Sequence, residues 1–136
     1  MIRVYADMTA DLFHFGHMAF LKKARALGDY LLVGVSGDEM SESYKRKPIL
    51  TMEERVASVA GCRYVNEVIP NSAYLVDSAW IKKYNISVVV HGDDLPQEEI
   101  QYYYKVPIEM GIFRVIPYTQ GISTSEIIRR IIGRRA

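Results

Sequence analysis

The feature that most constrains the fold of this chain is the alternation of short apolar runs with helical patterns. Each apolar run is short enough to be a strand, and each is followed by apolar residues that recur at helical spacing. Successive strand–helix–strand units imply parallel strands joined by right-handed crossovers. We therefore expect one α/β domain over residues 1–136, a Rossmann-like, doubly wound, mostly parallel sheet of about five strands with helices on both faces. The expected strands are residues 2–5, 30–35, 65–69, 86–90 and 113–116.

The expected helices follow from capping signals as well as from periodicity. One begins near Met18 and is closed by Gly28, and another is opened by a capping box of Thr51 and Glu54. Further helices are expected over residues 77–84, over residues 98–110 with an interruption at Pro107, and after a second capping box of residues 123 and 126. A proline at position 70 bounds the third strand, and residues 36–48 are read as a polar stretch.

Three polar turns follow predicted strands, at residues 11–17, 91–94 and 121–124. The carboxyl ends of parallel strands meet at one edge of a sheet, where ligands of open α/β sheets bind. We therefore expect the three turns to converge on one site.

The first of these turns holds Asp11, His14, Gly16 and His17, directly before a helix. The free N–H groups and the dipole at a helix N-terminus favour bound anions, and a glycine lets a phosphate approach the backbone. The turn is therefore predicted to hold the phosphates of a nucleotide. A metal site made by the carboxylate and the two imidazoles is one alternative, and a purely structural role for the histidines is another.

A basic run of Lys45, Arg46 and Lys47 ends the polar stretch that precedes the capped helix at Thr51. Its position suits a mobile flap that closes over phosphates, and a solvated loop is the alternative.

Composition excludes several classes of protein. The formal net charge of +1 gives no case for a nucleic-acid partner. Cys62 is the only cysteine, which excludes an internal disulfide and fits a reducing compartment. There is no apolar run of transmembrane length and no signal-peptide pattern at Met1. We expect a cytoplasmic protein without stable membrane insertion.

Three motifs resemble one known family. The sequence H-F-G-H at residues 14–17 matches the H-x-G-H signature of the nucleotidyltransferase superfamily. Residues 63–68, R-Y-V-N-E-V, resemble the R-Y-V-D-E-V segment of cytidylyltransferases, and residues 121–124 match their G-I-S-T segment. From about residue 2 to residue 132 the chain resembles the catalytic domain of the phosphoethanolamine, phosphocholine and glycerol-3-phosphate cytidylyltransferases.

This resemblance implies a reaction in which CMP passes from CTP to a small phosphorylated alcohol and pyrophosphate leaves. Positioning and charge stabilisation would then dominate catalysis. Mg²⁺ would arrive with CTP, near Asp11, with no tightly bound metal. The region around Tyr104, Lys105 and Gly111 is more similar to the ethanolamine and choline enzymes, which favours an amino-alcohol phosphate. A catalytically impaired nucleotide-binding module and an adenylyltransferase with the same chemistry are the alternatives.

The resemblance also implies roles for individual residues. His14, His17 and Lys45 would be catalytic. Arg55, Arg63 and Asn66 would support the site or a homodimer interface. The residues that would bind the nucleotide are Thr9, Ala10, Asp11, Gly16, Asp94, Thr119, Gly121, Ile122, Ser123 and Thr124.

The chain departs from the family pattern at four positions. Met8 and Ala10 stand where the family has glycine and phenylalanine, and Asn66 stands where it has an interface aspartate. Tyr118 replaces the arginine of R-T-x-G-I-S-T, which is expected to bind the triphosphate, and a tyrosine cannot carry that charge. We hypothesise that another basic residue supplies it, with Arg114, Arg46 and Lys47 as the candidates.

Overall fold

The computed structural model describes residues 1–44 and 46–134, so the predicted catalytic Lys45 lies outside the described residues. Its core is one five-stranded sheet in the order β3-β2-β1-β4-β5, and every neighbouring pair of strands is parallel. The expected α/β class and the expected number of strands are therefore confirmed. The strands are β1 (Arg3–Met8), β2 (Tyr30–Ser36), β3 (Glu67–Ser72), β4 (Val88–Gly92) and β5 (Phe113–Ile116).

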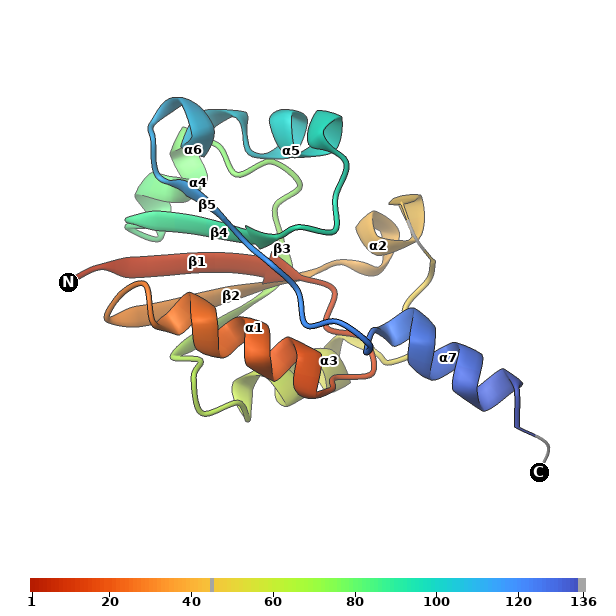
Figure 1. Ribbon diagram of the computed structural model, residues 1–136. Coiled ribbons are helices and arrows are strands. Elements are labelled where there is room, and N and C mark those ends of the chain that lie inside the picture. The colour runs from red at the N-terminus through yellow and green to blue at the C-terminus, as the bar shows by residue number, and fades with distance from the viewer. Residues whose placement is uncertain (45, 135–136) are drawn as a thin grey trace.

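Helices cover both faces of the sheet, as Figure 1 shows. Helices α1 and α3 pack on one face against a core that includes Val4, Leu31 and Val33. Helices α4, α5 and α6 cover the other face, where Tyr5 and Val89 belong to a second core. The helices are α1 (Phe15–Arg25), α2 (Asp38–Tyr44), α3 (Met52–Ala60), α4 (Ser78–Lys83), α5 (Gln97–Tyr103), α6 (Lys105–Glu109) and α7 (Thr124–Ile132).

The burial of each strand follows from its place in the sheet. Strands β1 and β2 lie inside the sheet and are covered on both faces, which is why their sequences are nearly continuous apolar runs. Strand β3 is an edge strand that pairs only with β2. Pro70 therefore lies within β3 instead of ending it, since an edge strand tolerates a residue without an N–H group.

Two helices differ from the sequence-based expectation. Helix α2 was not expected, because D-E-M-S-E-S-Y is mostly polar, yet its Met40 and Ser41 are buried. The helical region after residue 97 breaks at Tyr104 and not at Pro107. Pro107 lies in the first turn of α6, where a backbone N–H group has no intrahelical acceptor.

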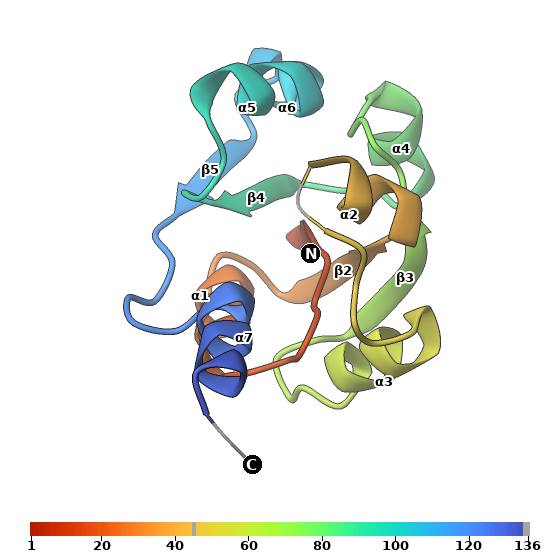
Figure 2. The ribbon, with the colours of Figure 1, turned by 90° about the vertical axis from the view of Figure 1, so that its right-hand side faces the viewer.

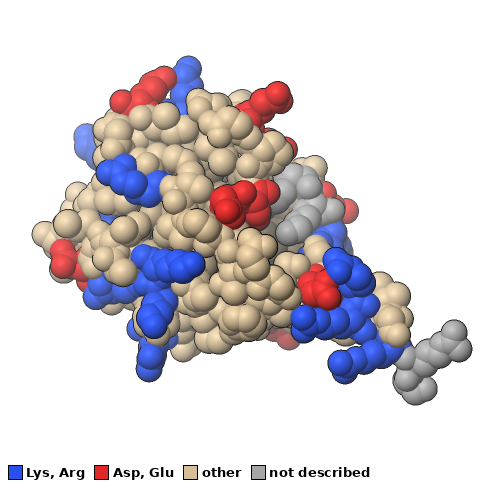
Figure 3. Space-filling view, in the orientation of Figure 1, with Lys and Arg blue, Asp and Glu red and all other residues tan. Residues whose placement is uncertain are grey.

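The carboxyl edge of the sheet faces the viewer in Figure 2, where α2, α7 and the turn before α1 surround it. Helix α7 projects from the body, and Figure 3 shows Lys and Arg side chains gathered along it, with Arg129 and Arg130 among them. Within the described ranges, no helix is both long enough and apolar enough to cross a bilayer.

Candidate functional site

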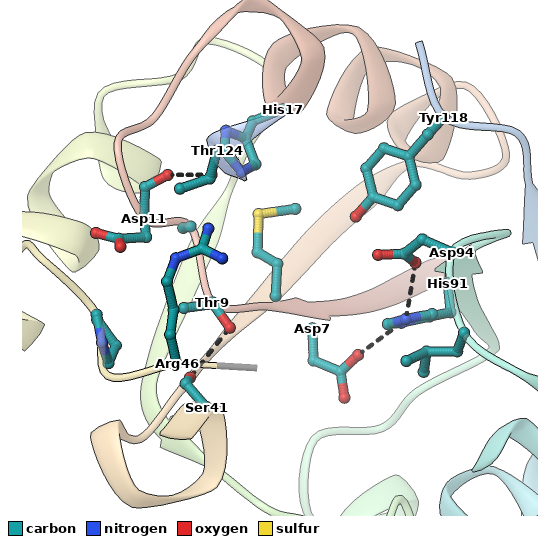
Figure 4. Close-up of a pocket in the computed structure, with 14 residues that line it drawn as sticks. Asp7, Thr9, Asp11, His17, Ser41, Arg46, His91, Asp94, Tyr118 and Thr124 are labelled. Atoms are coloured by element: carbon teal, nitrogen blue, oxygen red, sulfur yellow. Dashed lines mark hydrogen bonds and ion pairs between the residues drawn. The ribbon is translucent and has the colours of Figure 1, made fainter. Parts of the chain in front are cut away.

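A cleft lies at the carboxyl edge of the sheet, between α2 and the start of α7 (Figure 4). The three polar turns expected to converge all contribute to its lining. His17, Asp94, Tyr118 and Thr124 line both its deep part and its outer part. The deep part also receives residues of β1, α2 and the segment before α3, and the outer part is completed by residues 119–126.

The two histidines of the first turn form a reciprocal cap on α1. His14 is the N-cap residue, and its Nδ1 accepts a hydrogen bond from the Gly16 N–H group at 3.0 Å. Nδ1 of His17 accepts from the backbone N–H group of His14 at 3.1 Å. Because both Nδ1 atoms are acceptors, each neutral ring carries its proton on Nε2. The centroids of the two imidazole rings lie 4.0 Å apart. Burial lowers the pKa of His14, which favours the neutral form of that ring at pH 7.

Gly16 also has a packing role in the turn, and its expected contact with a phosphate stays a prediction. A Cβ atom at this position would lie 2.8 Å from Cε1 of His14 and 3.1 Å from Cγ2 of Ile122. The missing side chain therefore makes room for the His14 ring on the first turn of α1.

Asp11 joins three segments of the cleft and is 4% exposed. Its carboxylate accepts the N–H groups of Ile49 and Leu50 at 2.8 and 2.9 Å, and its carbonyl oxygen accepts the Thr124 hydroxyl at 2.8 Å. In Figure 4 the carboxylate points away from the middle of the cleft. Asp11 thus holds these three segments together, and the expected Mg²⁺ position near it stays a prediction.

The backbone before Asp11 is tied to α2 and adopts a left-handed conformation. The hydroxyl groups of Thr9 and Ser41 lie 3.0 Å apart, which ties the end of β1 to α2. Ala10 is buried and adopts a φ of 60°, a left-handed conformation that glycine adopts more easily. Both residues line the cleft, together with the buried Met8.

The G-I-S-T turn supplies the opposite wall. Ser123 caps α7 by accepting from the Glu126 N–H group at 3.0 Å, so one half of the expected capping box is present. Gly121 has a φ of 87°, which explains a glycine at that position. Thr119, Gly121, Ile122 and Ser123 all line the outer cleft. The first N–H groups of α7 therefore lie beside the histidine turn.

A buried polar cluster of Asp7, His91 and Tyr104 forms one end of the deep cleft. The sequence placed residue 91 in a turn of the expected site but did not identify Asp7. The Tyr104 hydroxyl donates to Oδ1 of Asp7 at 2.5 Å, and Nδ1 of His91 lies 3.2 Å from the same oxygen. Burial alone lowers the pKa of His91, but its hydrogen bond and charge interaction with Asp7, helped by Asp94, outweigh burial and raise the pKa overall. A carboxylate inside an otherwise apolar strand was the signal that could have identified Asp7.

Tyr118 stands on the far side of the cleft (Figure 4). Its ring stacks on Phe20 with centroids 5.2 Å apart, and its backbone N–H group donates to Asp93. A Cβ atom on Gly92 would come within 1.9 Å of the ring, so the glycine is what allows the tyrosine to lie there.

Of the three candidates for the missing charge, only Arg46 lines the cleft. Its Nη1 donates to the Ser125 hydroxyl at 3.2 Å. Arg114 instead donates to the carbonyl oxygens of Gly111 and Phe113 and lies on the exposed side of β5, and Lys47 is exposed outside the cleft lining.

The residues assigned to support or to an interface divide into two groups. Arg55 is completely buried below the cleft and donates to the carbonyl oxygens of Thr9, Ser36 and Leu50. Arg63 and Asn66 lie away from the cleft, in the connection between α3 and β3. Arg63 is exposed and bonds to Tyr64, and Asn66 exchanges hydrogen bonds with the backbone of Leu31.

Mg²⁺ is expected to enter the cleft with CTP, where carboxylate side chains could bind such an ion. Within residues 1–44 and 46–134 there is no group of three or more His, Cys, Asp or Glu side chains that could hold a metal. Mg²⁺ commonly uses one or two carboxylates together with substrate phosphates. Asp94, half exposed and shared by both parts of the cleft, is the carboxylate that fits this use.

Comparison with known proteins agrees with this geometry. A family model described as cytidylyltransferase-like matches residues 5–130. The chain is 45% identical over 137 residues to an ethanolamine-phosphate cytidylyltransferase of Dictyostelium discoideum, and the match covers 97% of this chain and 38% of that protein. It is 47% identical over 138 residues to an ethanolamine-phosphate cytidylyltransferase of Arabidopsis thaliana, with 96% and 32% covered. The chain thus spans only about a third of the length of these curated relatives.

A solved structure shares the fold. It is the crystal structure of the lipopolysaccharide core biosynthesis protein from Thermoplasma volcanium GSS1, with a TM-score of 0.69, 25% identity, and coverage of 88% of this chain and 97% of that one. Since the family model matches most of the chain, including the histidine turn and the G-I-S-T turn, the chain belongs to the cytidylyltransferase-like family.

Proposed function

We propose that this domain transfers CMP from CTP to the phosphate of a small amino alcohol. In this reaction an oxygen of the acceptor phosphate attacks the α-phosphorus of CTP. The bond from that phosphorus to the bridging oxygen of the β-phosphate breaks, and pyrophosphate leaves with the electron pair. The observation that carries the proposal is the meeting of His14 and His17 with the N-terminus of α7 in one cleft. The names of the two relatives described above, both ethanolamine-phosphate cytidylyltransferases, support the same reaction.

The histidine turn and the start of α7 supply donors for the phosphates. A neutral imidazole with its proton on Nε2 donates to a phosphate oxygen, and the first N–H groups of α7 present the positive end of a helix dipole. Donors of this kind stabilise the negative charge that builds as the new bond forms. Lys45 is proposed as a further catalytic cation, on the strength of the sequence resemblance alone. Mg²⁺ bound to CTP would lower the charge of the triphosphate, with Asp94 as its protein ligand.

The deep end of the cleft fits the amino group of the acceptor. Asp7 is 5% exposed, and both of its hydrogen bonds, from Tyr104 and from the neighbouring His91, are made through Oδ1. Oδ2 accepts no hydrogen bond from the part of the chain that is described, so it can accept from an ammonium group. This arrangement favours an amino-alcohol phosphate over glycerol 3-phosphate.

We further propose a cytoplasmic homodimer whose interface includes Arg63 and Asn66. These proposals rest on the lone cysteine and on the resemblance of residues 63–68 to a family interface segment.

Pyrophosphate release tests the activity. The protein is incubated with Mg²⁺, CTP or ATP, and phosphoethanolamine, phosphocholine or glycerol 3-phosphate. We expect release with CTP and an amino-alcohol phosphate, and its loss in His14→Ala. Release with ATP alone would assign an adenylyltransferase, and no release with any pair would indicate a binding module.

Asp7→Asn tests the acceptor site separately. We expect KM for phosphoethanolamine to rise about ten- to 100-fold, because a hydrogen bond between two charged groups is lost. KM for CTP should stay within about two-fold, since the phosphates bind at the other end of the cleft. An equal rise of both KM values would refute the proposed division of the cleft.

A further inference from the structure

The deep cleft contains a guanidinium group, that of Arg46, to which no carboxylate in the described part of the chain supplies a counter-charge. The Arg46 side chain extends into the cleft, toward Thr124 and His17, as Figure 4 shows. None of the described carboxylates forms an ion pair with it. Its Nε is fully buried and has no hydrogen-bond partner among the residues that the structure describes. An unpaired donor of this kind costs free energy until an acceptor arrives.

The neighbours of Arg46 orient this group without neutralising it. Among the described residues, its one hydrogen bond goes to the hydroxyl of Ser125, which is a neutral acceptor at the start of α7. The nearest acidic residue of the turn, Asp11, has both carboxylate oxygens bonded to the backbone N–H groups of Ile49 and Leu50. Asp11 therefore fixes the backbone at Ile49 and Leu50, shortly after Arg46, and does not form an ion pair with the Arg46 guanidinium.

The groups around Arg46 favour an anion in the same space. The cleft beside it is lined by His17 and Thr124, next to the helix N-terminus of α7. At the opposite end Asp7 supplies negative charge. The deep cleft thus has one end suited to anions and one end suited to cations.

We propose that Arg46 binds a phosphate group of the substrates, and that Asp11 acts as a positioning residue by holding the segment that carries it. This inference rests on the proposed function for the identity of the phosphate, which belongs either to CTP or to the phospho-alcohol. A planar guanidinium presents two parallel donors that match two phosphate oxygens. Arg46, in the segment between α2 and α3, thereby supplies the positive charge that is missing at position 118, where a tyrosine stands in place of the family's arginine.

Binding measured by calorimetry tests the inference without requiring turnover. The variants are Arg46→Ala and Arg46→Lys, with Lys47→Ala as the matched control because Lys47 is exposed and carries the same charge. The probes are inorganic pyrophosphate, CTP with Mg²⁺, phosphoethanolamine and cytidine. Urea unfolding of each variant checks that the fold is intact.

We expect Arg46→Ala to weaken binding of pyrophosphate and of at least one phosphate-bearing substrate about ten- to 100-fold. Arg46→Lys should recover part of this loss, and Lys47→Ala should stay within about two-fold. A loss confined to CTP assigns the arginine to the nucleotide, and a loss confined to phosphoethanolamine assigns it to the acceptor. Cytidine binding should not change, since cytidine has no phosphate.

A double variant tests whether a guanidinium at position 118 can replace the one at position 46. Tyr118→Arg places a guanidinium on the opposite wall of the same cleft, and added to Arg46→Ala it should restore at least half of the lost binding free energy. Asp11→Asn should weaken pyrophosphate binding in the wild-type background but not in Arg46→Ala.

Several results would overturn the inference. They are unchanged phosphate binding in Arg46→Ala, an equal loss in Lys47→Ala, and a wild-type protein that binds none of the phosphate probes. By contrast, a wild-type protein that binds pyrophosphate through Arg46 but never releases it from CTP would refute only the proposed function.

Discussion

Replacement of Arg55 by methionine should lower the free energy of unfolding by about 4 kcal/mol. Arg55 is 0% exposed and donates to the carbonyl oxygens of Thr9, Ser36 and Leu50. Three hydrogen bonds from a charged donor, at about 1.5 kcal/mol each, give about 4.5 kcal/mol, and methionine recovers a little through apolar contact. The ion pair with Asp38 adds under about 1 kcal/mol, since that carboxylate is 48% exposed and screened by water.

Urea unfolding followed by the fluorescence of Trp80, the only tryptophan, measures this change. The indole packs against Tyr5 and Tyr84 in the second core, so its emission should change when the sheet unfolds. With a slope of about 2 kcal/mol per molar urea, the midpoint should fall by about 2 M. Asp38→Asn is the matched control, and its midpoint should fall by no more than about 0.5 M.

A loss below about 1 kcal/mol in Arg55→Met would refute the reasoning that three backbone acceptors depend on this side chain. A loss in Asp38→Asn as large as that in Arg55→Met would assign the effect to the ion pair. Since two of the three carbonyls belong to segments that line or flank the cleft, Arg55→Met should also raise KM for CTP in the fraction that remains folded.

Two further predictions concern the cleft. In an NMR titration, His14 should titrate below 6.5 and His91 above it, and Asp7→Asn should lower the pKa of His91. The raised pKa of His91 adds stability that is present below the unfolded pKa of about 6.5 and is lost as the pH rises through the folded pKa, so Asp7→Asn should flatten this pH dependence. Equal pKa values for the two histidines would contradict this. Gly92→Ala should cost about 1–3 kcal/mol because the new methyl group overlaps the ring of Tyr118, and Tyr118→Ala added to it should recover part of that cost. A Gly92→Ala variant that melts at the wild-type temperature would show that the ring can move aside.

The sequence predicted those parts of the fold that depend on apolar periodicity and local capping. The strand at residues 113–116 and the capping box of Thr51 and Glu54 were predicted as observed. Other boundaries moved because tertiary position decides them. Pro70 is admitted into β3 by its place at the sheet edge, and α2 is stabilised by the burial of Met40 and Ser41, neither of which can be seen in a single sequence.

The candidate site could be predicted where a motif gathers its residues in one turn, as for His14 and His17. It could not be predicted where the site forms across distant segments. Asp7 lies in β1 and His91 in β4, which are far apart in the sequence. The two side chains meet because β1 and β4 are neighbouring parallel strands in the sheet. The choice of Arg46 over Arg114 likewise required knowing which basic side chain enters the cleft.

The strand order has a consequence for how the molecule assembles. Val4 of β1 pairs with Leu31 of β2 on one side and with Val88 of β4 on the other. A short stretch of chain separates Val4 from Leu31, and a much longer stretch separates it from Val88. Loop-closure entropy therefore favours early formation of a β1-β2-β3 half and of a β4-β5 half, which are joined late along the seam between β1 and β4. Asp7 and His91 face each other across that seam. The end of the cleft that holds Asp7 and His91 is thus completed in the same step as the sheet, and a ligand bound at Asp7 would slow unfolding by keeping the two halves together.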